Sequence, residues 1–360
     1  MAYQAIPMRQ EEHREEILAL WKENMSDSRM AEIAEPRFDW YYRRNPQGGP
    51  TTNLLLDCSS NRVVGCGSFF PRRIVLDGKP LWMGIMADFA VASAHRAAGP
   101  AIAIQRSLAD AGRAAGMNFL AAYPNRASEP IFKRIGYQAV GKSARWVKLL
   151  RSRKEMSRRF SDSVLAGAAG GVVDAGLAAL DLGRIARLPG RVKKMRGIYL
   201  DSSDDRFDTL WERARMAQRL TGERTSSYLN WRYRDFLSLK YRFFGLVDES
   251  GTSLFAYLTF FVNGNRASVV GDLFSGDFET TLDALLLRFS AAERKAGRES
   301  VSLDYLGPDP FGEKLNRLGF HRRATARSLF VYFDPATPQE LQRLVLDKSN
   351  WFTLDAEMDI

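Results

Sequence analysis

Residues 87–108, ADFAVASAHRAAGPAIAIQRSL, decide the fold. Residues 87–92 are apolar apart from one aspartate and predict a strand, whereas apolar residues recur at helical spacing from Ile102 to Gly116. A turn of small residues joins them. The first N–H groups of a helix have no partner within the helix, and the helix dipole adds partial positive charge there. A strand, a tight turn and a helix start therefore predict an anion-binding unit.

The side chains of the turn suit a phosphate. Short side chains, which let the backbone approach a phosphate closely, occur at Ala97, Ala98, Gly99 and Ala101. Arg96 adds a charge-assisted contact. Pro100 has no N–H, so one phosphate donor is missing and we expect a lower affinity, although proline is well placed in the first turn of a helix.

This stretch resembles the GNAT acetyltransferases. Arg96, Gly99 and Ala101 fit the family's pyrophosphate loop, and Asp88-Phe89-Ala90-Val91 is similar to the acidic-aromatic strand opening that precedes it. The resemblance implies an α/β fold (an α+β mixed sheet) and acetyl-CoA as the co-substrate, with its pyrophosphate on residues 96–101. Backbone N–H groups of Phe89, Ala90 and Val91 are then the expected donors to the thioester carbonyl.

Length and composition narrow the class of protein. A chain of 360 residues with 45% hydrophobic residues fits two globular domains. Cys58 and Cys66 form no C-x-x-C pair and the three histidines are far apart, so we expect no disulfide framework and no metal. We find neither a signal-peptide pattern nor an apolar run long enough to span a membrane, and we expect a cytoplasmic protein.

The order of elements in the first half recurs in the second. The aromatic segment Phe38–Arg44 is matched by Tyr228–Arg234, and Asp88-Phe89-Ala90 by Asp272-Leu273-Phe274. We therefore expect two tandem GNAT-like lobes joined by a basic helical arm. The predicted boundaries are 1–150 for an acetyl-CoA-binding lobe, 151–200 for the arm, 201–336 for a degenerate second lobe and 337–360 for a C-terminal tail.

The two predicted lobes differ at the turn. Residues 274–279 of the second lobe, FSGDFE, contain no arginine and carry Asp277 and Glu279 where a pyrophosphate is expected in the first. Because like charges repel, we expect the second lobe not to bind acetyl-CoA.

Two residues are candidates for proton transfer. Asp88 is either the base, or anchor of an ammonium group, or else a structural carboxylate at a strand bulge. The GNAT resemblance implies a tyrosine as the acid for the leaving thiolate, but Phe132 stands at that position and cannot donate a proton. Tyr123 is the substitute we expect. Asn125 either bonds the pantetheine amides or caps the following helix.

The net charge of +10 is concentrated in the arm. Between Arg145 and Arg196 there are thirteen basic and four acidic residues, which accounts for +9. Three fates are open for this segment: a linker helix docked on the lobes, weak association with an anionic membrane surface, or a nucleic-acid-binding arm. The absence of interleaved aromatic residues disfavours nucleic acid, and the interruption of the apolar stretch by Asp174 and Asp181 favours docking.

The predicted function is acetyl transfer from acetyl-CoA to a primary amine of a small molecule, sugar or peptide. One alternative is an aminoacyl transferase that resembles the Fem peptidoglycan ligases, which share doubled GNAT-like lobes but do not use CoA. The other is a degenerate scaffold, which Pro100 and Phe132 favour. The acceptor and the oligomeric state are not encoded in any pattern that we recognise.

Overall fold

A tight hairpin lies at the centre of the first sheet. The computed structural model describes residues 3–25, 27–96, 98–152, 163–236, 238–264, 266–324 and 327–355, without the side chains of 98 and 163–168. Asp77 and Gly78 join β3 (Arg62–Leu76) to β4 (Lys79–Val91), with φ angles of 47° and 79°. Positive φ at both turn residues is the geometry that Asp-Gly favours in two-residue hairpins, as the sequence predicts.

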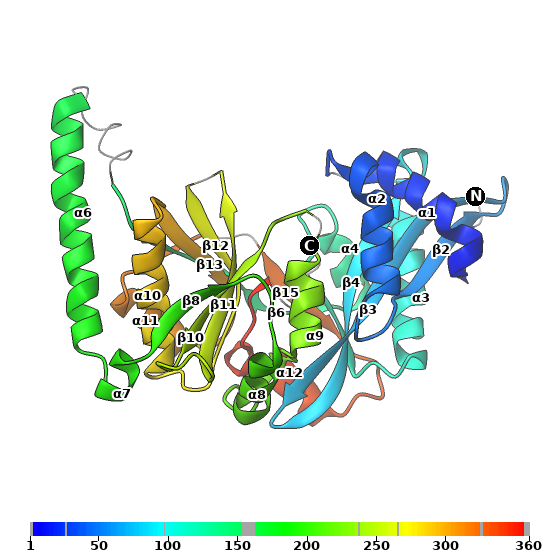
Figure 1. The fold of residues 1–360 in the computed structure, drawn as a ribbon. Coiled ribbons are helices and arrows are strands. Elements are labelled where there is room, and N and C mark those ends of the chain that lie inside the picture. The colour runs from blue at the N-terminus through cyan, green and yellow to red at the C-terminus, as the bar shows by residue number, and fades with distance from the viewer. Residues whose placement is uncertain are drawn as a thin grey trace.

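Seven strands of the first sheet follow one another in space, and we call this sheet with its helices lobe one (Figure 1). In spatial order they are β1 (Tyr3–Pro7), β2 (Thr51–Asp57), β3, β4, β5 (Phe119–Ala122), β15 (Ser328–Tyr332) and β6 (Gln138–Lys142). Neighbours are antiparallel except β4 and β5, which run parallel. The short β9 (Leu220–Gly222) pairs with the end of β3.

The second sheet, with its helices, is lobe two and has the same arrangement. Its strands in spatial order are β8 (Arg196–Leu200), β10 (Arg242–Val247), β11 (Leu254–Asn263), β12 (Ala267–Ser275), β13 (Ser300–Tyr305), β7 (Ala144–Leu149) and β14 (His321–Arg323). The single parallel pair, β12 with β13, occupies the same place as β4 with β5. The predicted mixed α/β fold with two GNAT-like lobes is confirmed.

The lobes exchange one strand each. β7 inserts between β13 and β14 of lobe two, and β15 inserts between β5 and β6 of lobe one. β6 therefore belongs to lobe one, whereas β7, which falls within the predicted 1–150 lobe, pairs in lobe two. Each exchanged strand is hydrogen-bonded on both sides, so the two sheets are tied by backbone as well as by side chains.

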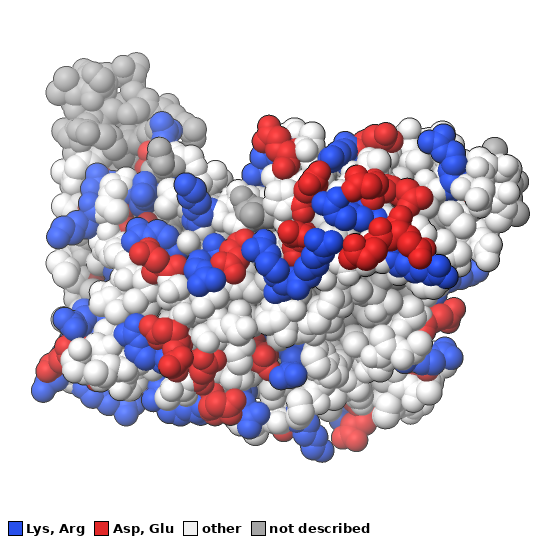
Figure 2. Space-filling model, turned by 45° about the vertical axis from the view of Figure 1, so that its right-hand side comes forward, with Lys and Arg blue, Asp and Glu red and all other residues white. Residues whose placement is uncertain are grey.

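Helices cover both faces of the sheet in lobe one. α3 (Ala98–Ala114) packs on one face through Ile104 and Leu108, whereas α1 (Gln10–Asn24) and α2 (Met30–Phe38) pack on the other. On their outer side acidic and basic side chains are interspersed, at the right of Figure 2. α3 begins four residues earlier than predicted, because Gly99 and Pro100 fit its first turn.

The remaining helices connect or cover the strands. They are η2 (Ser93–His95), α4 (Glu129–Ile135), α6 (Ser163–Ala186), α7 (Gly190–Lys193), α8 (Asp205–Ala214), α9 (Ser226–Leu229), α10 (Thr281–Lys295), α11 (Asp309–Arg317), α12 (Gln339–Leu346) and η4 (Lys348–Asn350). α8 ends at Ala214, and the chain enters β9 at Leu220. Among the described helices, none is long and apolar enough to cross a membrane.

The lobes meet at two matching π-helices, η1 (Asp39–Arg43) and η3 (Asn230–Arg234). Trp40 Nε1 donates to the backbone oxygen of Trp231 at 2.7 Å, and Trp231 Nε1 donates to the backbone oxygen of Trp40 at 2.8 Å. The two indole rings stack with centroids 4.8 Å apart. Trp40 and Trp231 thus make the same contact in both directions, and the aromatic residues of both segments lie in one core cluster.

Because of the Trp40–Trp231 hydrogen bonds, loss of an indole N–H should lower the free energy of unfolding more at Trp231 than at Trp146. Trp231 and Trp146 are equally buried, at 6% exposure, but Trp146 Nε1 has no acceptor within the described chain. Trp231→Phe is expected to lower the free energy of unfolding by about 1–3 kcal/mol more than Trp146→Phe, because it leaves the Trp40 carbonyl unsatisfied. Urea denaturation followed by circular dichroism measures both, and equal losses would contradict the assigned role of the indole hydrogen bond.

Candidate functional site

The end of β4 diverges from its neighbour and opens a cleft. β4 pairs with β5 only from Met83 to Ile85, so residues 86–91 continue beyond this pairing. On its other edge β4 carries a bulge, since Cys66 pairs with Ala90 but Ser68 pairs with Ala87. Asp88 lies in the bulge with φ of 52°, a left-handed conformation that costs energy for a residue with a side chain. Backbone strain is thus concentrated where the strand meets the cleft.

An ion pair holds the Asp88 side chain. Arg37 of α2 donates to Asp88 Oδ1 from Nη2 at 2.9 Å and from Nε at 3.3 Å, and the Asp88 side chain is 0% exposed. Lobe two repeats this arrangement, with Arg224 bound to Asp272 of β12 at 2.9 Å and both side chains 0% exposed. Because this buried ion pair is present in both lobes, it favours the structural role of Asp88 over the role of a base or ammonium anchor.

The turn after β4 leads directly into the cleft wall. Arg96 Nε donates to the backbone oxygen of Val91 at 3.1 Å, and its Nη2 donates to Asn24 Oδ1 at 3.1 Å. These acceptors are neutral, so they orient the guanidinium without cancelling its charge. Ala97 lies outside the described residues. Gly99 is exposed, with no atom within 4 Å of the place where a Cβ would stand, whereas Pro100 and Ala101 are buried.

The matching helix start in lobe two is already filled. Asp277 Oδ1 accepts the backbone N–H groups of Glu279 at 2.8 Å and Thr280 at 3.2 Å. Burial acts to raise the pKa of Asp277, but hydrogen bonds from Thr280 and from the backbone outweigh it and hold this pKa below its ordinary value. The carboxylate therefore takes the position that an anion would need.

Asn125 and α4 form another wall. Asn125 Oδ1 accepts the N–H groups of Ala127 at 3.0 Å and Ser128 at 2.9 Å, so it closes the turn before α4, whose N-cap residue is Ser128. Ser128 and Ile131 line the cleft. Phe132 does not, because it is buried at 4% exposure between α4 and the sheet, against Tyr137.

Tyr123 is separated from the other candidates. It is half-buried and packs with Ile85, Phe119 and Ala121 on the face of the sheet opposite α3. It is not among the residues of the described chain that line the cleft. The structure therefore brings Asp88, Phe89, Ala90, Val91, Arg96, Ala101 and Asn125 together around one cavity. Among the described candidates, Tyr123, Gly99 and Pro100 do not line it.

The far wall comes from residues that sequence reasoning missed. Asp27 and Arg29 lie between α1 and α2, where Arg29 Nη2 binds Asp27 Oδ2 at 2.9 Å, and these hydrogen bonds hold the pKa of Asp27 below its ordinary value. Arg29 also donates to the backbone oxygen of Ser238 in lobe two at 3.2 Å. The sequence did contain a signal for this wall, because Phe236 and Ser238 come shortly after the second of the two matched aromatic segments, Tyr228–Arg234.

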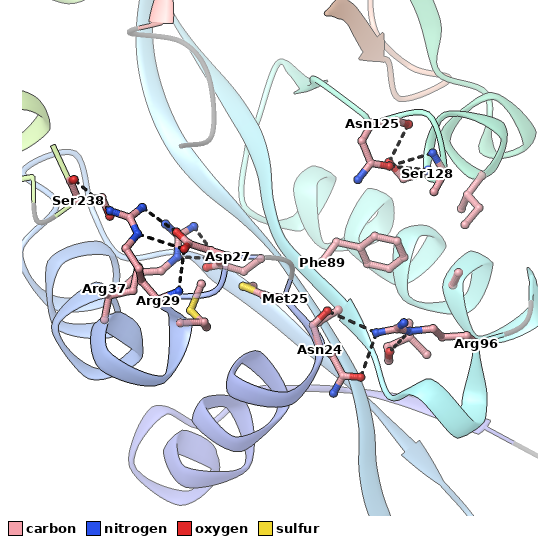
Figure 3. Close-up of a pocket in the computed structure, with 18 of the residues that line it drawn as sticks. Asn24, Met25, Asp27, Arg29, Arg37, Phe89, Arg96, Asn125, Ser128 and Ser238 are labelled. Carbon is pink, nitrogen blue, oxygen red and sulfur yellow. Dashed lines mark hydrogen bonds and ion pairs between the residues drawn. The ribbon is translucent and has the colours of Figure 1, made fainter. Parts of the chain in front are cut away.

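The walls enclose a cleft of about 900 Å³ (Figure 3). Its apolar lining includes Met25, Met30, Ile33, Phe89, Phe236 and Leu239. Both carboxylates at its edge, Asp27 and Asp88, are bound by arginines, so the Arg96 guanidinium supplies the unbalanced charge. No group of His, Cys, Asp and Glu side chains within the described ranges has the arrangement that a metal ion needs.

Comparison with known proteins shows which family the first lobe resembles. Residues 6–140 match the family described as "Acetyltransferase (GNAT) domain". A probable N-acyltransferase of unknown function from Enterococcus faecalis has 12% identity and a TM-score of 0.64, over 92% of this chain and 73% of that one. GCN5-related N-acetyltransferases from Anabaena variabilis (13%, 0.65, 92% and 73%) and Kribbella flavida (14%, 0.60, 92% and 71%) are similar. At these identities the solved structures show the fold alone, and no curated protein matches.

Proposed function

We propose that the chain is an N-acetyltransferase with one working site, in lobe one, on the premise that residues 6–140 match the GNAT acetyltransferase domain. Acetyl-CoA is the proposed donor. The proposed acceptor is a primary amine of a small molecule, a sugar or a peptide.

The observation that carries this proposal is the difference between the two helix starts. In lobe one the first turn of α3 has open space above Gly99 and a charged guanidinium beside it. In lobe two the Asp277 carboxylate occupies the turn that leads into α10, where it accepts the N–H groups of Glu279 and Thr280. A pyrophosphate carries negative charge and needs N–H donors, so lobe one suits it and lobe two repels it.

The cleft has further features that suit the rest of acetyl-CoA. The donor supplies an activated thioester, whose carbonyl carbon the acceptor amine attacks. The β4 backbone at Phe89–Val91 lines the cleft beyond its pairing with β5, and we propose that its N–H groups polarise that carbonyl. Asn125 fixes the turn before α4, and this wall is the proposed contact for the pantetheine arm.

The proposed reaction needs a group that accepts the amine proton and a group that protonates the leaving thiolate. The Asp88 carboxylate is bound to Arg37 and fully buried, which supports a role in holding the bulge rather than direct contact with an amine. Tyr123 lies away from the cleft lining, so its role as the acid for the thiolate has no geometric support here. Ser128, the N-cap residue of α4, lines the cleft and donates from Oγ to Asn125 Oδ1 at 3.1 Å, and its hydroxyl is our candidate for this step.

Lobe two is proposed to complete the acceptor side. Phe236, Ser238 and Leu239 face lobe one across the cleft, and Arg29 binds the backbone of Ser238. Together with Met25 and Met30 they make an apolar wall, which favours an acceptor whose amine is attached to an apolar group. The second lobe then contributes to the site without a donor site of its own.

Acetyl-CoA binding and turnover distinguish this proposal from the two alternative functions. An aminoacyl transferase that resembles the Fem ligases uses no CoA, and a scaffold would not turn it over. The Arg96–Ala101 turn, which carries no acidic residue, supports CoA use, whereas Pro100 and Phe132 remain the features that favour a scaffold. Calorimetry with acetyl-CoA, followed by thiol release with a panel of amines, distinguishes all three.

Gly99→Glu is expected to weaken acetyl-CoA binding by about a hundredfold or more, because a carboxylate would enter the open space and repel the pyrophosphate. The fold should persist, since no atom lies within 4 Å of the new Cβ. Gly190→Glu is the matched control, at the first turn of α7 with equally open space. Calorimetric titration in which Gly99→Glu binds like the wild type would refute the pyrophosphate assignment.

Asp88→Asn and Asp272→Asn form a second matched pair. Each leaves a buried arginine without its carboxylate, so each should lower the free energy of unfolding by about 3–5 kcal/mol. Only Asp88→Asn is expected to lower kcat, by about tenfold or more, because its bulge lines the cleft. Acetyl-CoA affinity should hold. A loss of kcat that is uniform across pH indicates positioning, a shifted acidic limb indicates a base, and unchanged kcat would leave Asp88 with a structural role alone.

A further inference from the structure

Exposed apolar side chains are concentrated on α6. Within the described chain, the large apolar residues that are exposed are Leu149, Val172, Val173, Leu180, Leu182, Tyr199 and Met216. Four of these seven lie on α6, and Val172 is 75%, Leu182 65% and Leu180 58% exposed. Figure 1 shows α6 at the outer edge of the molecule, with α10 on its inner side.

The two acidic residues of α6 point inward. Asp181 is 2% exposed and binds Lys148 at 2.8 Å and Arg294 at 2.6 Å. Asp174 accepts hydrogen bonds from the backbone N–H and the hydroxyl of Ser152, at 2.6 and 2.9 Å. The sequence suggested that these residues interrupt the apolar stretch. They instead anchor its inner face to lobe two and leave the outer face without an acidic charge.

The outer face is therefore apolar along the described part of the helix. With 3.6 residues per turn, the side opposite Asp174 and Asp181 presents six residues, Val172, Ala175, Gly176, Ala179, Leu180 and Gly183. The exposed Leu182 lies at the border of this face. All six are exposed, and a Cβ at Gly176 or Gly183 would meet no atom within 4 Å. Nothing in the described chain covers this face.

Basic side chains surround the lower end of this face. Arg187, Arg191, Lys193 and Lys194 are exposed where α6 leads into α7. In Figure 2, Lys and Arg side chains gather at the lower left, at the end of the molecule that carries α7. Asp277 offsets one of them, since it lies 3.4 Å from Arg191. The apolar face thus ends in a surface with excess positive charge.

We propose that the outer face of α6 lies on an anionic lipid surface, with its apolar residues at the level of the headgroups and the basic residues of 187–194 against the lipid charges. This arrangement is typical of helices that lie in the interface plane, and it does not require a membrane-spanning helix. It is independent of the acetyl-transfer proposal, because it uses no residue of the cleft.

A second copy of the chain fits this face less well. A helix of 24 residues is about 36 Å long and about 10 Å wide, so its face offers roughly 360 Å², against about 800 Å² per partner in a stable interface. Parallel packing would also bring the two basic ends together. Antiparallel packing would separate the basic ends but leave them without counter-charges, whereas anionic headgroups neutralise these charges, which favours the lipid surface.

The test is flotation of the full chain with vesicles of phosphatidylcholine alone or mixed equally with phosphatidylserine. We expect binding to the mixed vesicles only, with a loss of about tenfold when salt rises from about 0.1 M to about 0.5 M. The triple variant Val172→Gln, Leu180→Gln, Leu182→Gln should not float, nor should Lys193→Gln with Lys194→Gln. Met216→Gln, which removes an apolar side chain 64% exposed elsewhere, should float like the wild type.

Three results would overturn the proposal: no flotation, equal flotation with both kinds of vesicle, or flotation that the triple variant retains. Sedimentation equilibrium tests the other occupant. A dimer that the triple variant abolishes, without flotation of the wild type, would assign the face to a second copy. Circular dichroism and acetyl-CoA titration of each variant establish that a loss of flotation does not come from unfolding.

Discussion

The reciprocal contact between Trp40 and Trp231 determines how the two lobes meet. Each indole donates to the other's backbone, at 2.7 and 2.8 Å, and the rings stack at 4.8 Å, so neither lobe can rotate without breaking both hydrogen bonds. The Phe236 ring lies 5.0 Å from that of Trp40. The same contact therefore holds residues 236–239 of lobe two over the cleft of lobe one, and the exchanged strands β7 and β15 reinforce it.

Within this symmetric frame, one helix start differs between the lobes. Both have a strand bulge with a buried Arg–Asp pair, and both continue into a long helix. In lobe two Asp277 accepts the backbone N–H groups of the turn before α10, whereas in lobe one the first turn of α3 offers Gly99 and no acidic side chain. A single carboxylate at this position satisfies the backbone donors and adds negative charge, which is sufficient to remove an anion site. The symmetry of the fold thus does not extend to function.

Much of the fold could be predicted because it depends on local patterns. The Asp77-Gly78 hairpin, the αL stop at Gly136 and the alternation that directs Asp88 and Phe89 to opposite faces all follow from nearby residues. The strand exchange could not be predicted, because β7 and β15 are both short strands and no local pattern indicates which sheet accepts them. The far wall of the cleft was missed for a similar reason, since Arg29 and Ser238 meet only through the lobe interface. For Asp88, sequence left two roles open, and burial with Arg37 favours the structural one.

The central claim is that lobe one alone holds acetyl-CoA, at the β4 bulge and the start of α3. Hydrogen–deuterium exchange of the intact chain, with and without saturating acetyl-CoA, tests it at the level of single segments. We expect slower exchange for peptides that cover 89–91 and 98–101, and no change for those that cover 274–281 in lobe two. Protection of the lobe two segment, or no protection at 98–101 when acetyl-CoA binds, would contradict the account.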